Sequence, residues 1–376
     1  MQQFSPPNAL RRDPRLDVLR GLALVMIFIN HVPGNIYEHL TSRNFGFSDA
    51  AEGFVLMSGI ACGLAYSGRF RTDGFLSAAL RMWRRARKLY LVHLLIIGQA
   101  IALLGLGISL FDTFDLAFRV NFLAIAEKPL EAILGVAMLG HQLAYFNILP
   151  LYVVLMMLGA GYVMIGLRSI PTMIGIAIAV WVLAGTFRLN LPNYPGNGGW
   201  FFNPLAWQLL FAVGIAGGIA ARQGRPLVPY SPWLFGVAIA YLLFSLVWTR
   251  QALGPLPGSE YVPFYVGSFD KSYLPLPRLL HILAVAYVLI NLNWVMNASR
   301  SVFAHPLAVM GRSSLPVFAV GSVLALALQL YKDIIHTGPL ADGALLGMAL
   351  VVQYWVARLS LGNSMPAPVA TTAAAR

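Results

Sequence analysis

Long apolar stretches recur along the chain, and most approach the roughly 20 residues that a helix needs to cross a bilayer. They predict an all-α, polytopic integral membrane protein. We expect ten transmembrane helices over residues 18–36, 49–66, 89–110, 145–167, 170–187, 201–221, 231–249, 278–297, 314–331 and 340–361. The stretch 116–141 is also partly apolar, but its charges and Pro129 favour helices lying on the membrane surface over an eleventh span.

The distribution of charge supports this class and predicts an orientation. Charged residues make up 11% of the chain, against about 25% in soluble domains. With the N-terminus in the cytoplasm, most Lys and Arg residues fall in cytoplasmic loops, as the positive-inside rule requires, and both termini lie inside. This bias explains the net charge of +12 without nucleic acid as a partner. We expect one transmembrane domain over 1–362 and a disordered tail over 363–376.

Two ionisable residues stand in the first apolar stretch. Arg20 and His31 are eleven positions apart in "RLDVLRGLALVMIFINH", so they share one helix face and lie about 16 Å apart along it. Ionisable side chains inside a membrane commonly mark functional sites. The alternative for His31 is a structural hydrogen bond between helices.

Two carboxylates begin the second predicted span. Asp49 and Glu52 are spaced i and i+3, so they are neighbours on one helix face near the depth of His31. A carboxylate bound to one imidazole nitrogen orients the ring and raises the basicity of the other nitrogen. Either residue could therefore make His31 a general base, although an acid at the position of Asp49 is also a common helix N-cap.

A group of cations precedes the third predicted span in "RMWRRARK". Such a group can anchor the protein on anionic membrane lipid, or it can bind phosphate, which guanidinium groups fit well. With Arg20 on the same side, it favours an extended phosphorylated donor such as a coenzyme A thioester. These cations are Arg81, Arg84, Arg85, Arg87 and Lys88.

Several segments resemble known membrane acyltransferases. An arginine, ten residues and a histidine on the first span resemble the acyltransferase-3 type, and "RLDVLRGLALVMIFINH" also looks like the lysosomal heparan N-acetyltransferase group. The chain is most similar to the OpgC family, which succinylates osmoregulated periplasmic glucans. The matching segments are "RLDVLRGLALVMIFINHVPGN", "FSDAAEGFVLMSG", "WFFNPLAWQLLFAVG", "DKSYLPLPRLLHILAVAY" and "MGRSSLPVFAVGS".

The resemblance implies transfer of a succinyl group from succinyl-CoA to a glucan hydroxyl across the bacterial inner membrane. By similarity, His31 would be catalytic and Arg20 its motif partner. Lys271, Arg278 and His281 lie in a matching segment near the predicted outer face and are the expected substrate-binding residues. Lys271 and Arg278 would bind the succinyl carboxylate or an anionic glucan, or would simply extend to the membrane interface.

The sequence therefore predicts a membrane O-acyltransferase in which His31 removes a proton from the acceptor hydroxyl. Direct transfer and an acyl-histidine intermediate both remain open. The alternative class is a transporter of an anion or a proton-coupled solute, which would use the same buried ionisable residues. Because Cys62 is the only cysteine, a cysteine metal cluster is excluded, and no metal is expected. The oligomeric state stays open, with a homodimer among the alternatives.

Overall fold

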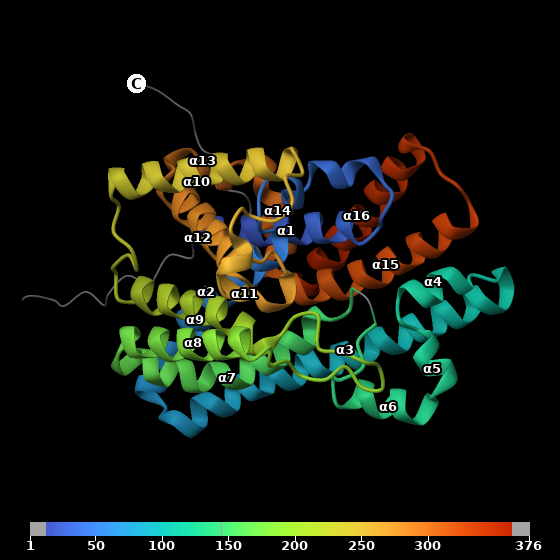
Figure 1. Ribbon diagram of the computed structural model, residues 1–376, viewed down its shortest axis with the longest axis horizontal. Helices are drawn as coiled ribbons and strands as arrows, with labels where there is room; N and C mark the ends of the chain where they lie inside the picture. Colours follow the sequence, from blue (N-terminus) through green and yellow to red (C-terminus); the bar gives the residue numbers. More distant parts are fainter. Residues whose placement is uncertain (1–12, 144, 363–376) are drawn as a thin grey trace, which may run out of the picture.

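The computed structural model describes residues 13–143 and 145–362, and these residues form helices and loops without a strand. The long helices form the body of the molecule, and most but not all of them run roughly along the longest axis (Figure 1). They are α1 (Pro14–Asn30), α2 (Ala50–Thr72), α3 (Phe75–Phe111), α7 (Ile148–Arg168), α8 (Ile170–Thr186), α9 (Pro204–Arg222), α10 (Pro232–Arg250), α12 (Leu276–Asn291), α15 (Ser314–Ile334) and α16 (Pro339–Leu361). The predicted tail 363–376 lies outside the described residues.

Shorter helices connect the long ones. The α-helices among them are α4 (Phe114–Arg119), α5 (Leu123–Glu127), α6 (Pro129–Ala137), α11 (Phe264–Gly267), α13 (Asn293–Ser299) and α14 (His305–Arg312). The 3-10 helices are η1 (Ile36–Leu40), η2 (Ser42–Asn44), η3 (Ser259–Tyr261), η4 (Lys271–Tyr273) and η5 (Val302–Ala304). Helices α4, α5 and α6 occupy the partly apolar stretch 116–141, and each is too short to cross a bilayer.

The all-helical class is confirmed, but a count of ten spans is not. Each predicted stretch overlaps a long helix, and seven helices are long and apolar enough to cross a membrane. An eighth span results if α12 and α13, which meet at a 78° bend, are counted together. Helix α8 is apolar but has 17 residues, and α1 has 17 residues with Arg15, Asp17 and Arg20 among them.

Helices α2 and α9 pack with their backbones in direct proximity. Each carries two glycines four residues apart, which are Gly59 and Gly63 on α2 and Gly214 and Gly218 on α9. A Cβ atom on any of the four would overlap backbone atoms of the other helix. Small residues at this spacing allow close helix approach inside membranes. The contact fixes where α2 lies, and with it the carboxylates at the start of α2.

Replacing Gly214 by alanine should therefore lower the free energy of unfolding by about 1–3 kcal/mol or more, because the added methyl group forces the two helices apart. The measurement is thermal unfolding of the purified protein in detergent. Gly217→Ala is the matched control on the same helix, since a Cβ there has its nearest neighbour, a side-chain carbon of Ile60, at 3.6 Å. Equal unfolding temperatures for the two variants would contradict the proposed close contact.

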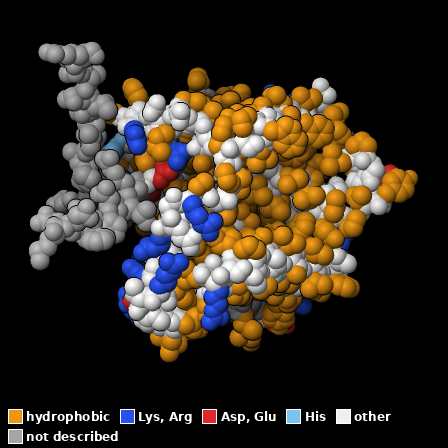
Figure 2. Space-filling model, turned by 90° about the vertical axis from the view of Figure 1, so that its left-hand side faces the viewer, with side chains coloured by type: hydrophobic (Ala, Val, Ile, Leu, Met, Phe, Trp, Pro, Cys, Tyr) orange, Lys and Arg blue, Asp and Glu red, His pale blue; other side chains and the backbone are white. Residues whose placement is uncertain are grey.

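Helix α1 begins and helix α16 ends at the same end of the bundle. Arg312 is ion-paired to Asp17 in the first turn of α1, with 3.1 Å between Nε and Oδ2. The neighbouring Ser313 donates a hydrogen bond to the carbonyl of Ala357 near the end of α16. Helix α3 begins and helices α2 and α9 end here too, and Lys and Arg side chains gather on this face (Figure 2). We call it the basic end.

Candidate active site

His31 lies at the other end of α1 from the basic end. Its backbone N–H closes the helix on the carbonyl of Ile27, and its own carbonyl accepts a hydrogen bond from Gln329 Nε2 of α15 at 2.6 Å. The imidazole packs against the ring of Tyr145, with 4.7 Å between the centroids. The ring nitrogens form no hydrogen bond with residues 13–143 or 145–362. No described group therefore holds either ring nitrogen by a hydrogen bond.

The carboxylates that the sequence singled out build the start of α2. Asp49 is the N-cap, and its side chain accepts a hydrogen bond from the backbone N–H of Ala51 at 2.8 Å. Glu52 Oε2 accepts one from the backbone N–H of Asp49 at 3.0 Å. This reciprocal capping box satisfies backbone donors at the helix start, where negative charge is also favoured by the helix dipole. The N-cap interpretation of Asp49 is thus confirmed.

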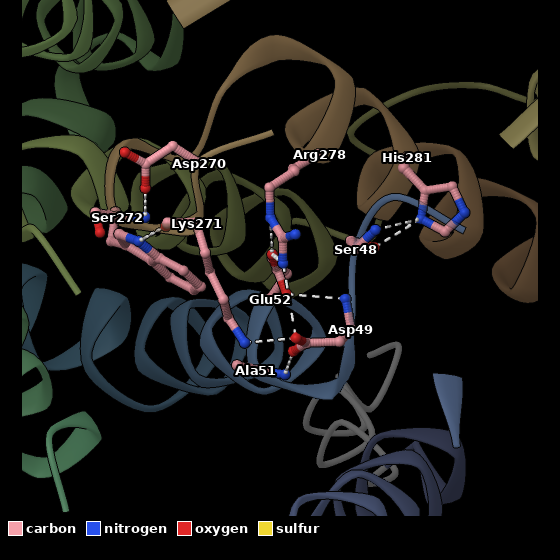
Figure 3. Close-up of polar contacts among 10 residues, drawn as sticks. Ser48, Asp49, Ala51, Glu52, Asp270, Lys271, Ser272, Arg278 and His281 are labelled. Carbon is pink, nitrogen blue, oxygen red and sulfur yellow. Dashed lines mark hydrogen bonds and ion pairs between the residues drawn. The ribbon is translucent and has the colours of Figure 1, made fainter. Parts of the chain in front are cut away.

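Both carboxylates also form ion pairs with residues more than 200 positions further along the chain (Figure 3). Lys271 of η4 donates to Asp49. Arg278 in the first turn of α12 binds Glu52, with 2.8 Å between Nε and Oε1, and lies 3.6 Å from Asp49. Glu52 is completely buried, and buried charges persist only when they are paired in this way. We call these four residues the ion-pair cluster.

The cluster changes the predicted relation between the carboxylates and His31. Neither carboxylate forms a hydrogen bond with the imidazole in the described part of the chain. The charges of Lys271 and Asp49 nevertheless lie close enough to act on the ring through space. Two cations and two carboxylates also cancel in charge. The cluster therefore sits beside His31 as a neutral, internally satisfied group.

The sequence predicts that Lys271 and Arg278 bind a substrate carboxylate or extend to the membrane interface. Their side chains are only 23% and 13% exposed, so neither extends freely to the membrane interface. Each already binds a protein carboxylate. Burial by itself raises the pKa of Asp49, but the nearby cations Lys271 and Arg278 outweigh it, so the pKa of this carboxyl lies below its usual value. Asp49 therefore stays ionised and keeps Lys271 engaged.

His281 lies behind the ion-pair cluster and is only 6% exposed. Its Nδ1 atom is 2.7 Å from the hydroxyl of Ser48 and accepts a hydrogen bond from the Ser48 backbone N–H at 3.3 Å. A Cβ atom on Gly46 would overlap the other side of the ring, so the imidazole sits directly on this loop. Because Ser48 precedes Asp49, the contact favours a supporting role for His281 over the substrate contact expected from sequence.

Arg20 opens onto a cavity of about 220 Å³ between α1, α2, α3, α7 and α15. Its Nη2 atom donates to the carbonyl of Met57 at 3.1 Å. The walls are mainly apolar, with one polar pair in which the hydroxyl of Tyr152 donates to Ser58 at 3.1 Å. Neither of these two residues carries a sequence signal, because a lone tyrosine or serine in an apolar run is common.

The five cations of the predicted group on α3 have different surroundings in the structure. Arg85 lines the same cavity as Arg20. Arg81 instead forms an ion pair with Asp73 at 3.0 Å. The remaining members are exposed at the basic end and do not line this cavity; they are Arg84, Arg87 and Lys88. Arg20 and Arg85 are therefore the two predicted cations that line one cavity.

Two long loops, 187–203 and 251–275, lie beside the ion-pair cluster on the side away from the basic end, and the second one contains Lys271. The hydroxyl of Tyr273 donates to the carbonyl of Arg188 at 3.0 Å and joins the loops. The indole N–H of Trp207 donates to the carbonyl of Lys271 at 3.0 Å. Phe201 lies 5.9 Å from Lys271 Nζ and is 47% exposed, so it offers an aromatic face next to the cluster.

Seven helices long and apolar enough to cross a bilayer indicate an integral membrane protein, and a cluster of paired charges is buried inside its bundle. A family model described as "OpgC protein" matches residues 12–363, so the chain belongs to the OpgC family. Membership implies a glucan-modifying acyltransferase. No significant match was found among curated proteins or among solved structures.

Proposed function

We propose that the protein transfers a succinyl group from cytoplasmic succinyl-CoA to hydroxyls of osmoregulated periplasmic glucans in the bacterial inner membrane. The observation that carries the proposal is the family match over nearly the whole chain, joined to a His31 ring whose nitrogens are free for a substrate. In this proposal the basic end faces the cytoplasm and the ion-pair cluster lies towards the periplasm. The orientation follows the positive-inside rule.

The donor would enter from the basic end. Arg20 and Arg85 line one cavity, and their guanidinium groups suit the phosphates of coenzyme A. The apolar walls suit the long pantetheine arm. The line from Arg20 to His31 along α1 is about 16 Å, which such an arm can cover. The acceptor would approach from the other side, where Phe201 and the two long loops lie.

In the proposed reaction, His31 takes the proton of a glucan hydroxyl. The oxygen then attacks the thioester carbonyl, the C–S bond breaks, and the coenzyme leaves as a thiolate that recovers the proton. General-base help of this kind contributes about 10²–10⁴ in rate. If His31 itself attacks first, an acyl-histidine forms as the C–S bond breaks and the coenzyme leaves as its thiol. The glucan hydroxyl then attacks the acyl group, the acyl–nitrogen bond breaks, and the imidazole recovers the proton. The two routes differ in kinetics, because the second gives a ping-pong pattern.

A test of the proposal is acyl transfer by the purified protein in liposomes. Succinyl-CoA and acetyl-CoA are supplied in parallel with periplasmic glucan, and released thiol and glucan mass are followed together. We expect thiol release with succinyl-CoA and a glucan mass increased by succinyl units. The same increments with acetyl-CoA alone would correct the acyl group. Absence of both reactions would favour the transporter alternative, which uptake of labelled anions would then test.

His281 provides a prediction about positioning. His281→Ala removes the acceptor that holds Ser48, and we expect kcat to fall by about 10–100-fold through displacement of the start of α2, with the KM for glucan unchanged. His281→Asn should recover most of the rate, because its amide oxygen can accept the same hydrogen bonds. Steady-state kinetics decide between the roles, because a substrate contact would instead raise KM and would not be rescued by asparagine.

A further inference from the structure

A second pocket opens at the basic end, between the ends of α2, α7 and α9. Its volume is about 110 Å³. It shares no lining residue with the cavity under Arg20, and none of its residues takes part in the proposed reaction. The lining consists of Ser67, Gly68, Arg71, Leu167, Ile219, Arg222 and Gln223. We propose that this pocket binds a phosphate group.

Two arginines from different helices reach the pocket. Arg222, the last residue of α9, donates from Nη1 to the carbonyl of Leu64 at 3.0 Å. Its guanidinium also lies across Gly68, where a Cβ atom would overlap it. The group is therefore held in place with further N–H donors to offer. Arg71, one position before the end of α2, is exposed and forms no ion pair with a described carboxylate.

The remaining lining favours an anion with several acceptor oxygens. Ser67 is 2% exposed, and its hydroxyl has no hydrogen-bond partner among the described residues. A buried hydroxyl without a partner is unfavourable, and a phosphate oxygen would supply an acceptor. Among residues 13–143 and 145–362, no carboxylate lines the pocket. Guanidinium groups bind phosphate in a forked geometry, so two of them beside a hydroxyl donor match a tetrahedral phosphate.

The phosphate could belong to the headgroup of an anionic phospholipid or to a soluble phosphate compound. Both offer the same oxygens to Arg71 and Arg222. The pocket lies at the basic end, where cationic side chains gather (Figure 2). By the positive-inside rule such a face lies beside the headgroups of the cytoplasmic leaflet. This proposal does not depend on acyl transfer, so it stands or falls separately from the reaction at His31.

The test is thermal unfolding of the full-length protein in detergent with four additives. They are phosphatidylglycerol, phosphatidylcholine, sodium phosphate, and sodium chloride at the same ionic strength. The R71Q/R222Q variant removes the pocket cations, and R69Q/R168Q removes the same charge from neighbours outside the lining. We expect a saturable rise in Tm for the wild type and the R69Q/R168Q control, and an apparent affinity at least about tenfold weaker in R71Q/R222Q.

The additive that produces this pattern identifies the source. Phosphatidylglycerol without inorganic phosphate indicates a lipid headgroup, and inorganic phosphate indicates a soluble compound. Equal weakening in the two double variants, or no saturable effect of either probe, overturns the proposal, since diffuse charge then explains the binding. If R71Q/R222Q does not fold, S67A carries the test, because it keeps every charge and should still weaken binding.

Discussion

Replacing His31 by alanine is expected to lower acyl transfer by about 10²–10⁴-fold while the protein stays folded in the membrane. The imidazole holds no hydrogen bond to the described protein, whereas the backbone bond from Gln329 to the carbonyl of residue 31 survives the substitution. The loss should therefore be chemical and not structural. The measurement is a mass spectrum of periplasmic glucans from a deletion strain. The strain carries either the wild-type gene or the His31→Ala gene, with equal amounts of the two proteins in the membrane.

His39→Ala is the matched control for this experiment. His39 is an exposed histidine in η1, a short distance along the chain from His31, and its removal should leave glucan modification unchanged. Succinyl groups in the His31→Ala culture at the wild-type level would show that His31 is structural. Unmodified glucans in the wild-type culture as well would refute the donor, the acceptor or the enzymatic role.

Replacing Arg278 by alanine is expected to lower the free energy of unfolding by about 3–5 kcal/mol. The substitution leaves the Glu52 carboxyl completely buried and without its main partner, and it also removes a neighbour of Asp49. An uncompensated buried charge is much more costly than the loss of an exposed ion pair. Chemical or thermal unfolding in detergent measures the effect. In cells, the same destabilisation would lower the amount of the protein in the membrane.

The double variant Glu52→Gln with Arg278→Met isolates the electrostatic cause. It removes both charges at similar side-chain volume, so we expect it to recover much of the stability that Arg278→Ala loses. Arg43→Ala is a control, because Arg43 pairs with Glu38 at 3.5 Å and its side chain is 46% exposed. That pair should contribute no more than about 1 kcal/mol. Similar losses for Arg278→Ala and Arg43→Ala would show that the buried pair does not stabilise the fold.

The sequence by itself determined the helical stretches and the local chemistry of their ends. Apolar runs of spanning length predicted each long helix, because a helix in lipid satisfies its own backbone and leaves a pattern readable without knowing its neighbours. The cap at Asp49 was readable for the same reason, since its partners lie within three residues.

The tertiary structure decided which of these helices meet and which charges find partners. Lys271 and Arg278 reach Asp49 and Glu52 across more than 200 residues, and no local pattern encodes that distance. The 78° bend between α12 and α13 likewise interrupts the continuous span expected over 278–297. Burying a lone charge in an apolar stretch is energetically costly, so the sequence indicates that each such charge has a partner. Their identity follows only from packing, which here places α12 and η4 against the start of α2.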